Sequence, residues 1–278
     1  MPAPIIVKAS GEQQRFSPKK LRASLLKCGL DQKCARETTE EVARQVRDQM
    51  SSRGIFNLAH QKLKQTNRPI AYRYSLKRAI FELGPTGFPF EQIIGRLFEK
   101  LHYDVKTNLM VPGKCIEHEV DCILERPGET AWVECKFHNV PGTISDLKTA
   151  LYVYARYLDL KEYRVDSRDK AMWLVSNTRF SSEAIQFSNC RGVNLLGWEY
   201  PVQGGLNVLL ERNQLYPITT LSTLSRKQKL HLMDNQIYTT EDFQENRKKV
   251  LRSGLTEQKW ADLCFEIDSL HKLEIEKP

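Results

Sequence analysis

The fold is decided by one stretch of sequence: His118-Glu119-Val120-Asp121-Cys122-Ile123-Leu124, the turn Arg126-Pro127-Gly128-Glu129, and Thr130-Ala131-Trp132-Val133-Glu134-Cys135-Lys136. The two apolar arms around a Pro-Gly turn predict a β-hairpin. If the four-residue turn closes this hairpin, Leu124 pairs with Ala131, Cys122 with Val133 and Val120 with Cys135. These pairs give one apolar face with the period of two that a strand requires. Asp121 is then expected opposite Glu134.

The two opposed acids need an explanation, because like charges repel when side chains face each other at roughly 4.5–5.5 Å between Cβ atoms. A divalent cation would offset that repulsion, and Mg²⁺ is commonly held by one or two carboxylates plus phosphates. Lys136 points to the same side as Glu134, where an ammonium group could orient a water molecule. This set suits phosphodiester hydrolysis. The alternative is that these residues form the solvated face of an ordinary hairpin.

The segments around the hairpin alternate between helical and strand patterns, which predicts an α/β fold. Apolar residues at helical spacing predict a helix over 87–101, and a short strand is expected around 103–105. After the hairpin we expect a helix over 146–158, a buried strand over 171–176, a helix over 181–190 and a strand over 193–196. A stripe of Lys148, Tyr152 and Arg156 on the first of these helices favours packing over phosphate contact.

This order, with Gly87-Phe88-Pro89-Phe90-Glu91 preceding the D…ExK pair, resembles the core of PD-(D/E)xK nucleases. The similar branch contains Mrr-type restriction enzymes and archaeal Holliday-junction resolvases, and the resemblance covers about residues 84–198. It implies a restriction-endonuclease-like core, with a central mixed sheet flanked by helices. It also implies that Asp121, Glu134 and Glu91 hold Mg²⁺ or Mn²⁺, and that Lys136 completes the catalytic set. Glu99 is a weaker candidate, two helical turns beyond Glu91.

The N-terminal segment predicts a hairpin over 5–17, a helix that begins at Ser17-Pro18 and a further helix over about 38–50. Lys8, Gly11, Phe16, Lys20 and Leu21 match a signature that resembles the ATP-cone, a small nucleotide-binding module of a β-hairpin plus helices. The resemblance implies that Lys8, Gly11 and Lys20 bind ATP or dATP. Two features depart from it. Ala9 stands where the family usually has arginine, and the segment over residues 54–60 is short, without the strand-like residues that introduce the third helix in the family. A cone used only for packing or oligomerisation is the alternative.

From Tyr216 onward, short helices joined by tight turns predict a small helical bundle with Thr240 and Thr256 as N-caps. The spacing resembles a helix-hairpin-helix DNA-binding module, although the Gly-rich hairpin is absent. A packing or oligomerisation bundle is the other reading. Because Gly84-Pro85-Thr86-Gly87 ends a helix, the predicted domains are 1–83, 84–205 and 206–278.

Bulk properties favour a polyanionic partner without identifying it, because the net charge is +8 and the isoelectric point is about 9.1. The resemblance to nucleases implies that this partner is DNA. Seven cysteines without a C-x-x-C pair indicate thiols in a reducing cytoplasm, and Cys122, Cys135 and Cys190 are expected on apolar faces. We expect no membrane-spanning segment and no signal peptide. A homo-oligomer is left open.

Taken together, the chain resembles ATP-cone restriction endonuclease fusion proteins over nearly its whole length. The leading hypothesis is a cytoplasmic Mg²⁺-dependent DNA endonuclease that a nucleotide regulates, acting in restriction, defence or repair. A second hypothesis is a nucleotide-responsive DNA-binding regulator without catalysis. The third is a constitutive nuclease or junction resolvase with a vestigial cone.

Overall fold

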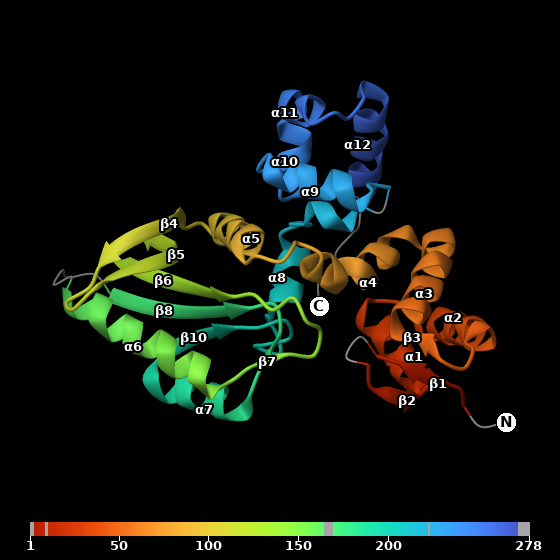
Figure 1. The fold of residues 1–278 in the computed structure, drawn as a ribbon, viewed down its shortest axis with the longest axis horizontal. Helices are drawn as coiled ribbons and strands as arrows, with labels where there is room; N and C mark the ends of the chain where they lie inside the picture. Colours follow the sequence, from red (N-terminus) through yellow and green to blue (C-terminus); the bar gives the residue numbers. More distant parts are fainter. Residues whose placement is uncertain (1–2, 9–10, 164–168, 222, 272–278) are drawn as a thin grey trace. The chain divides into compact units, whose positions relative to one another are not determined.

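The computed structural model describes residues 3–8, 11–163, 169–221 and 223–271 (Figure 1). The chain divides into two compact units. The first contains the residues up to Arg78 together with the end of the chain from Phe265, and the second is Ala79–Cys264. Each unit has its own apolar core.

The first unit combines a small three-stranded sheet with helices. Strands β1 (Ile5–Val7) and β2 (Gln13–Arg15) are antiparallel, and β3 (Met50–Ser51) pairs with β1 in parallel. The helices are α1 (Pro18–Lys27), α2 (Gln32–Gln45), α3 (Ser52–Thr66) and α4 (Arg68–Phe81), which continues into the second unit. Leu25, Ala35, Ala59 and Leu63 are fully buried in the core between the helices.

The predicted hairpin and the start of α1 are confirmed, since the Ser17 hydroxyl accepts a hydrogen bond from the Lys20 N–H. The predicted helix over 38–50 is displaced. It begins earlier, because Asp31 caps the N–H groups of Lys33 and Cys34, and it ends at Gln45. The prediction that a strand is missing before α3 is wrong, because β3 fills that place with two residues. Ala9 lies outside the described residues.

The second unit is built on a five-stranded sheet of order β10-β8-β6-β5-β4, which confirms the central mixed sheet that the resemblance implies. Strands β4 (Asp104–Pro112), β5 (Glu117–Arg126) and β6 (Glu129–Lys136) are antiparallel, while β8 (Asp169–Ser176) and β10 (Val193–Leu196) continue the sheet in parallel with β6. Helix α5 (Phe88–Lys100) covers one face, and α6 (Leu147–Tyr163) with α7 (Ser182–Arg191) covers the other (Figure 1). A two-residue strand β7 (Ile144–Ser145) pairs with β9 (Arg179–Phe180).

Both faces of the central strands are buried, which explains why β6 and β8 read as nearly continuous apolar runs. Trp132 and Met172 pack in one cluster with Val153 and Leu160 of α6. On the α5 side, the thiol of Cys122 contacts the Glu91 carbonyl oxygen at 3.8 Å. The sheet is therefore the central layer of a three-layer arrangement.

The hairpin register is confirmed near the turn and fails further out. Cys122 pairs with Val133 and Leu124 with Ala131, but within the described residues this ladder ends at Cys122 and Val133. Val120 packs in the cluster with Trp132, so the predicted pairing of Val120 with Cys135 is wrong. The strand changes face at Asp121, beside Asn108 of β4, which has a left-handed φ of 54°.

The end of the second unit is helical, as expected. It contains α8 (Leu206–Arg212), the 3-10 turn η1 (Ile218–Thr220), α9 (Arg226–Asp234), α10 (Thr240–Glu245) and α11 (Arg247–Arg252), and α12 (Glu257–His271) then runs into the first unit. Thr256 caps α12 as predicted, since it accepts from the Lys259 N–H at 3.2 Å. The cap of α10 is Thr239, so the prediction of Thr240 is wrong. Thr239 has the acidic partner Asp242 three residues later that a capping box requires.

The seven cysteines are free thiols. Cys122 is buried and Cys135 half-buried, whereas Cys190 is exposed, contrary to expectation. Ala184 and Ser188 form the buried side of α7, and two residues beyond Ser188 the helix faces the other way. None of the helices that the structure describes is long and apolar enough to cross a membrane.

Candidate active site

Helix α5 can bring Glu91 to the sheet because it carries glycine where it meets β4. A Cβ atom at Gly95 would lie 3.1 Å from Cγ2 of Thr107, closer than most such contacts. At Gly87, just before the helix, a Cβ would lie 2.9 Å from Oε1 of Glu91. The two glycines therefore leave room for the helix and for the Glu91 carboxylate.

Asp121 lies where the hairpin ladder opens. Its Oδ2 accepts a hydrogen bond from the Cys135 N–H at 2.6 Å, so the side chain replaces a backbone contact between β5 and β6. Burial raises the pKa of Asp121, while the Cys135 N–H and the Arg156 guanidinium act to lower it. The carboxylate is thus fixed in position and partly removed from water.

Glu134 is held by α6, the helix that covers the face of the sheet opposite α5. Its side chain is 19% exposed, and Nη1 of Arg156 donates to its Oε2. Nη2 of Arg156 donates to the Glu119 carbonyl oxygen, so this guanidinium joins α6 to both strands. Burial and the nearby charge of Asp121 raise the pKa of Glu134 to about 7, although Arg156 opposes the rise.

Glu91 occupies the first turn of α5 and faces the same region. Burial is the main cause that raises its pKa to about 7, and the charge of Asp121 is the next. Its Oε2 accepts a long hydrogen bond of 3.5 Å from Nδ2 of Asn108. Asp121 therefore acts electrostatically on both Glu91 and Glu134, which makes it the centre of an acidic cluster.

Asn108 is a site residue that the sequence does not reveal. Asparagine is among the residues that best tolerate a left-handed backbone, and such strained positions concentrate at functional sites. Besides donating to Glu91, it accepts from Nε2 of Gln92 at 3.2 Å. Arg156 was visible in the sequence as part of a helical stripe, but its bond to Glu134 joins residues far apart in the chain.

Lys136 ends β6 with an exposed side chain, and its positive charge acts to lower the pKa of Glu134. The strand end is anchored by hydroxyl groups. Ser176 donates to the Lys136 carbonyl oxygen at 3.0 Å and also contacts Ser145 at 3.0 Å. Ser145 in turn contacts Nε2 of His138 at 3.0 Å. This network fixes the backbone from which the Lys136 ammonium projects.

Glu99, the weaker sequence candidate, and His118, at the start of the hairpin, have their structural partners elsewhere. Glu99 accepts from Nη1 of Arg96 at 3.1 Å and lines a pocket beside the C-terminal helices, so it does not join the acidic cluster. His118 lies 2.8 Å from Oδ2 of Asp159 and joins β5 to α6.

The acidic cluster has the donors that a hard cation prefers, but it is not a complete metal cage. In the described ranges, no three His, Cys, Asp or Glu side chains form a group that could hold a metal ion by themselves. Mg²⁺ usually keeps several waters and binds substrate phosphates with one or two carboxylates. Burial is the first cause of the raised carboxyl pKa values at Asp121, Glu134 and Glu91, and the charge of Asp121 adds to the rise at the other two. A bound cation would offset both effects.

The predicted nucleotide-binding residues lie in the first unit. Lys8 and Gly11 belong to the turn between β1 and β2, where the Lys8 ammonium contacts Oε2 of Glu12 at 2.9 Å. Gly11 has a φ of 84°, which other residues rarely adopt. Lys20 is exposed in the first turn of α1.

Comparison with known proteins places the chain in a family. Residues 216–271 match the family model described as AF1548-like, C-terminal. An uncharacterized protein of Archaeoglobus fulgidus is 44% identical over 128 residues, which cover 46% of this chain and 71% of the relative. The chain belongs to the AF1548-like family. The crystal structure of AF1548, titled a protein of unknown function, is 34% identical with a TM-score of 0.56, over 66% of this chain and 98% of that chain.

Weaker similarities connect this AF1548-like protein to two nucleases. A repair endonuclease from Pyrococcus abyssi is 14% identical with a TM-score of 0.32, covering 40% of this chain and 46% of that one. The MspJI restriction endonuclease, solved with a 27-mer oligonucleotide, is 15% identical with a TM-score of 0.31, covering 65% and 41%. Scores of this size carry no conclusion about activity.

Proposed function

We propose that this protein is a Mg²⁺-dependent DNA endonuclease with a restriction-endonuclease-like core, regulated by ATP or dATP at its N-terminal module. The observation that carries the proposal is the position of Asp121, whose charge acts on both Glu91 and Glu134, with Lys136 two residues beyond Glu134 on β6. Structural ion-pair clusters also perturb carboxyl pKa values, but they have no need of an exposed lysine beside them.

Asp121 and Glu134 would hold Mg²⁺, or Mn²⁺ in its place, and Glu91 would help to hold it through the waters that Mg²⁺ keeps, since the three carboxylates do not by themselves form a metal-binding group. When bound, the ion supplies Lewis-acid stabilisation of the phosphate and lowers the pKa of a water ligand. Arg156 keeps Glu134 oriented and offsets part of the negative charge. Lys136 orients the attacking water and stabilises the charge that develops on the phosphate oxygens. The net charge of +8 favours DNA as the substrate polyanion.

Nicking of supercoiled plasmid with Mg²⁺ tests the catalytic part. We expect Asp121→Asn and Lys136→Met to lower the nicking rate by about a hundredfold or more, the usual scale for a general acid–base or electrostatic group. Glu117→Gln and Lys106→Met are matched controls, because they remove an exposed acid from β5 and an exposed lysine from β4. If Asp121→Asn nicks at the parent rate, or the parent never nicks, the proposal is refuted.

Calorimetric titration with ATP and dATP tests the regulatory part. The parent should bind the nucleotide, and the double variant Lys8→Ala with Lys20→Ala should not, since the ammonium groups of both lysines would face the nucleotide phosphates. Lys19→Ala removes an exposed neighbouring charge as the control. A parent that binds neither nucleotide would remove the regulatory role and leave the nuclease role standing. DNA binding without metal or cleavage would instead favour the non-catalytic regulator.

A further inference from the structure

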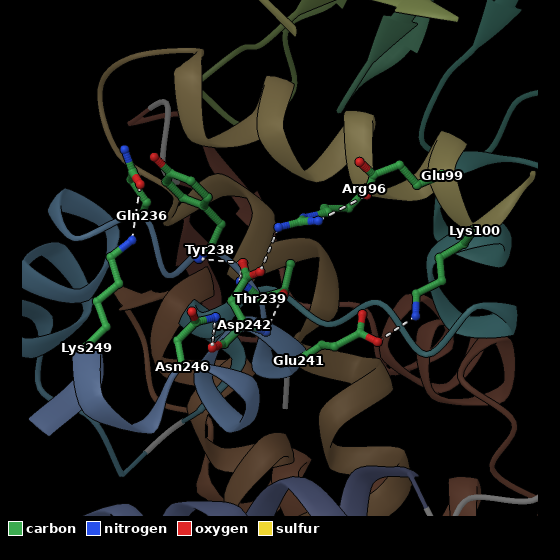
Figure 2. Close-up of polar contacts among 10 residues, drawn as sticks. All are labelled: Arg96, Glu99, Lys100, Gln236, Tyr238, Thr239, Glu241, Asp242, Asn246 and Lys249. Carbon is green, nitrogen blue, oxygen red and sulfur yellow. Dashed lines mark hydrogen bonds and ion pairs between the residues drawn. The ribbon is translucent and has the colours of Figure 1, made fainter. Parts of the chain in front are cut away.

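Helix α5 borders a second site on the side where it meets the family-defining C-terminal segment. A pocket of about 370 Å³ lies between α5 and β4 on one side and residues 236–249 on the other. Figure 2 shows side chains of α5 and of this segment extending toward one another. The volume is at the low end of small-molecule sites, which suits one ring system better than a longer ligand.

The pocket walls are fixed by two ion pairs between α5 and α10 (Figure 2). Nη2 of Arg96 lies 3.3 Å from Oδ1 of Asp242, and Nζ of Lys100 lies 2.6 Å from Oε1 of Glu241. Asp242 is buried, and its Oδ2 also accepts from the N–H groups of Tyr238 and Thr239 at 3.0 Å. The pocket therefore exists before any ligand binds, which lowers the cost of binding.

The charges in this pocket are internally matched. The Arg96 guanidinium contacts both Glu99 and Asp242, so a cation lies between two acids. The Lys249 ammonium contacts Oε1 of Gln236 at 3.1 Å. Two cationic and two acidic side chains line the pocket, which gives no excess positive charge for a phosphate group. A neutral ligand with hydrogen-bonding edges fits this chemistry better.

The remaining lining residues are three amides and two aromatic rings, together with Gly95, Val105 and Thr107. Gln92, Gln236 and Asn246 each offer a donor and an acceptor, which is the pattern that reads the edge of a nucleobase. Phe88 and Tyr238 form an edge-to-face pair with ring centroids 6.1 Å apart, and aromatic faces are the usual stacking partners of unpaired bases.

We propose that this pocket binds a single nucleobase. The inference rests on the proposed DNA substrate where the base belongs to a bound strand, and the same chemistry would accept a free nucleoside. Gln92 links the pocket to the acidic cluster, because it donates to Asn108 at 3.2 Å and Asn108 donates to Glu91. A base extruded from the strand would be recognised one residue away from a proposed metal ligand.

The test uses the full chain in EDTA, so that no cleavage is required. The probes are 2-aminopurine deoxyriboside and single- and double-stranded oligonucleotides that contain one 2-aminopurine, with fluorescence as the readout. Gln236 has a left-handed φ of 60°, so Gln236→Gly keeps the backbone and removes the amide. Phe88→Ala removes an aromatic ring that is 44% exposed. Gln214→Gly is the matched control, because Gln214 has a φ of 52° and does not line the pocket.

We expect saturable binding of at least one probe by the parent, weakened about tenfold or more in Gln236→Gly and Phe88→Ala and unchanged in Gln214→Gly. Binding of the oligonucleotides alone assigns the pocket to a base of the DNA strand, whereas binding of the deoxyriboside assigns it to a free nucleoside. No fluorescence change with any probe, or equal affinity in all variants, overturns the inference. Because plasmid nicking is measured separately, a failure of the nuclease proposal would remain distinguishable.

Discussion

The raised pKa of Glu134 makes a quantitative prediction for Glu134→Gln. A carboxyl group whose pKa rises from 4.5 to about 7 on folding holds its proton more tightly in the folded chain. Its contribution to stability is therefore complete below about pH 4.5 and is lost as the pH rises through about 7. A pKa difference of one corresponds to about 1.36 kcal/mol, so the full rise contributes about 3 kcal/mol to the free energy of unfolding at low pH. The side chain is 19% exposed, so solvent screening reduces this value only modestly.

Urea unfolding in EDTA at about pH 5.5 and about pH 8 measures this difference. The four tryptophans, Trp132, Trp173, Trp198 and Trp260, lie in the second unit, so their fluorescence reports its unfolding. Because part of the effect is already lost at about pH 5.5, the parent should lose about 2 kcal/mol more than Glu134→Gln between the two pH values. Glu117→Gln, which removes an exposed acid from β5, should behave like the parent. Equal pH dependence in the parent and Glu134→Gln would refute the reasoning.

A second arm of the same experiment connects stability to the proposed metal. At about pH 8, Mg²⁺ should stabilise the parent, by about 2.7 kcal/mol at a hundred times its Kd, and should stabilise Glu134→Gln less. No effect of Mg²⁺ on the parent under these conditions would count against the metal site while leaving the pH argument intact.

Three further substitutions test the contacts around the site. Arg156→Met should lower the free energy of unfolding by about 3 kcal/mol at about pH 8, where the ionised Glu134 would be buried without its partner. The loss should be smaller at about pH 5.5, where Glu134 is protonated. Equal losses in urea unfolding at the two pH values would contradict this. Gly95→Ala should cost about 1–3 kcal/mol because the new Cβ would crowd Thr107, and combining it with Thr107→Ser should recover part of the loss in melting experiments. Thr239→Ala should cost about 1 kcal/mol through loss of the α10 cap, whereas Thr240→Ala, whose hydroxyl forms no cap, should cost less on thermal unfolding.

The fold was predictable where local rules act alone. A Pro-Gly turn and a period of two predict the register from Cys122 to Leu124, and alternating helices and strands predict an α/β fold, whereas the mixed sheet followed from the resemblance to nucleases. The register failed at Asp121, because its carboxylate takes the Cys135 N–H in place of a ladder bond. Strand β3 has two residues, too few for periodicity to detect.

The site was predictable only in part. The acidic residues and Lys136 share a recognisable spacing, and the structure brings Asp121 within electrostatic reach of both Glu91 and Glu134. The bond from Arg156 to Glu134 spans 22 residues, and the left-handed backbone of Asn108 depends on its surroundings. The sequence contains the capping box of Thr239 and Asp242, but the prediction places the N-cap one residue too late, at Thr240.

Glu91 and Gln92 are consecutive residues of α5. Glu91 belongs to the acidic cluster, and Gln92 lines the pocket beside the C-terminal helices. Both residues lie in one continuous helix of 13 residues, so a displacement of the helix at one site would also reach the other. A ligand bound against Gln92 and Arg96 would therefore tilt the carboxylate of Glu91. If both proposals hold, a ligand bound beside the C-terminal helices would change the rate of the proposed cleavage.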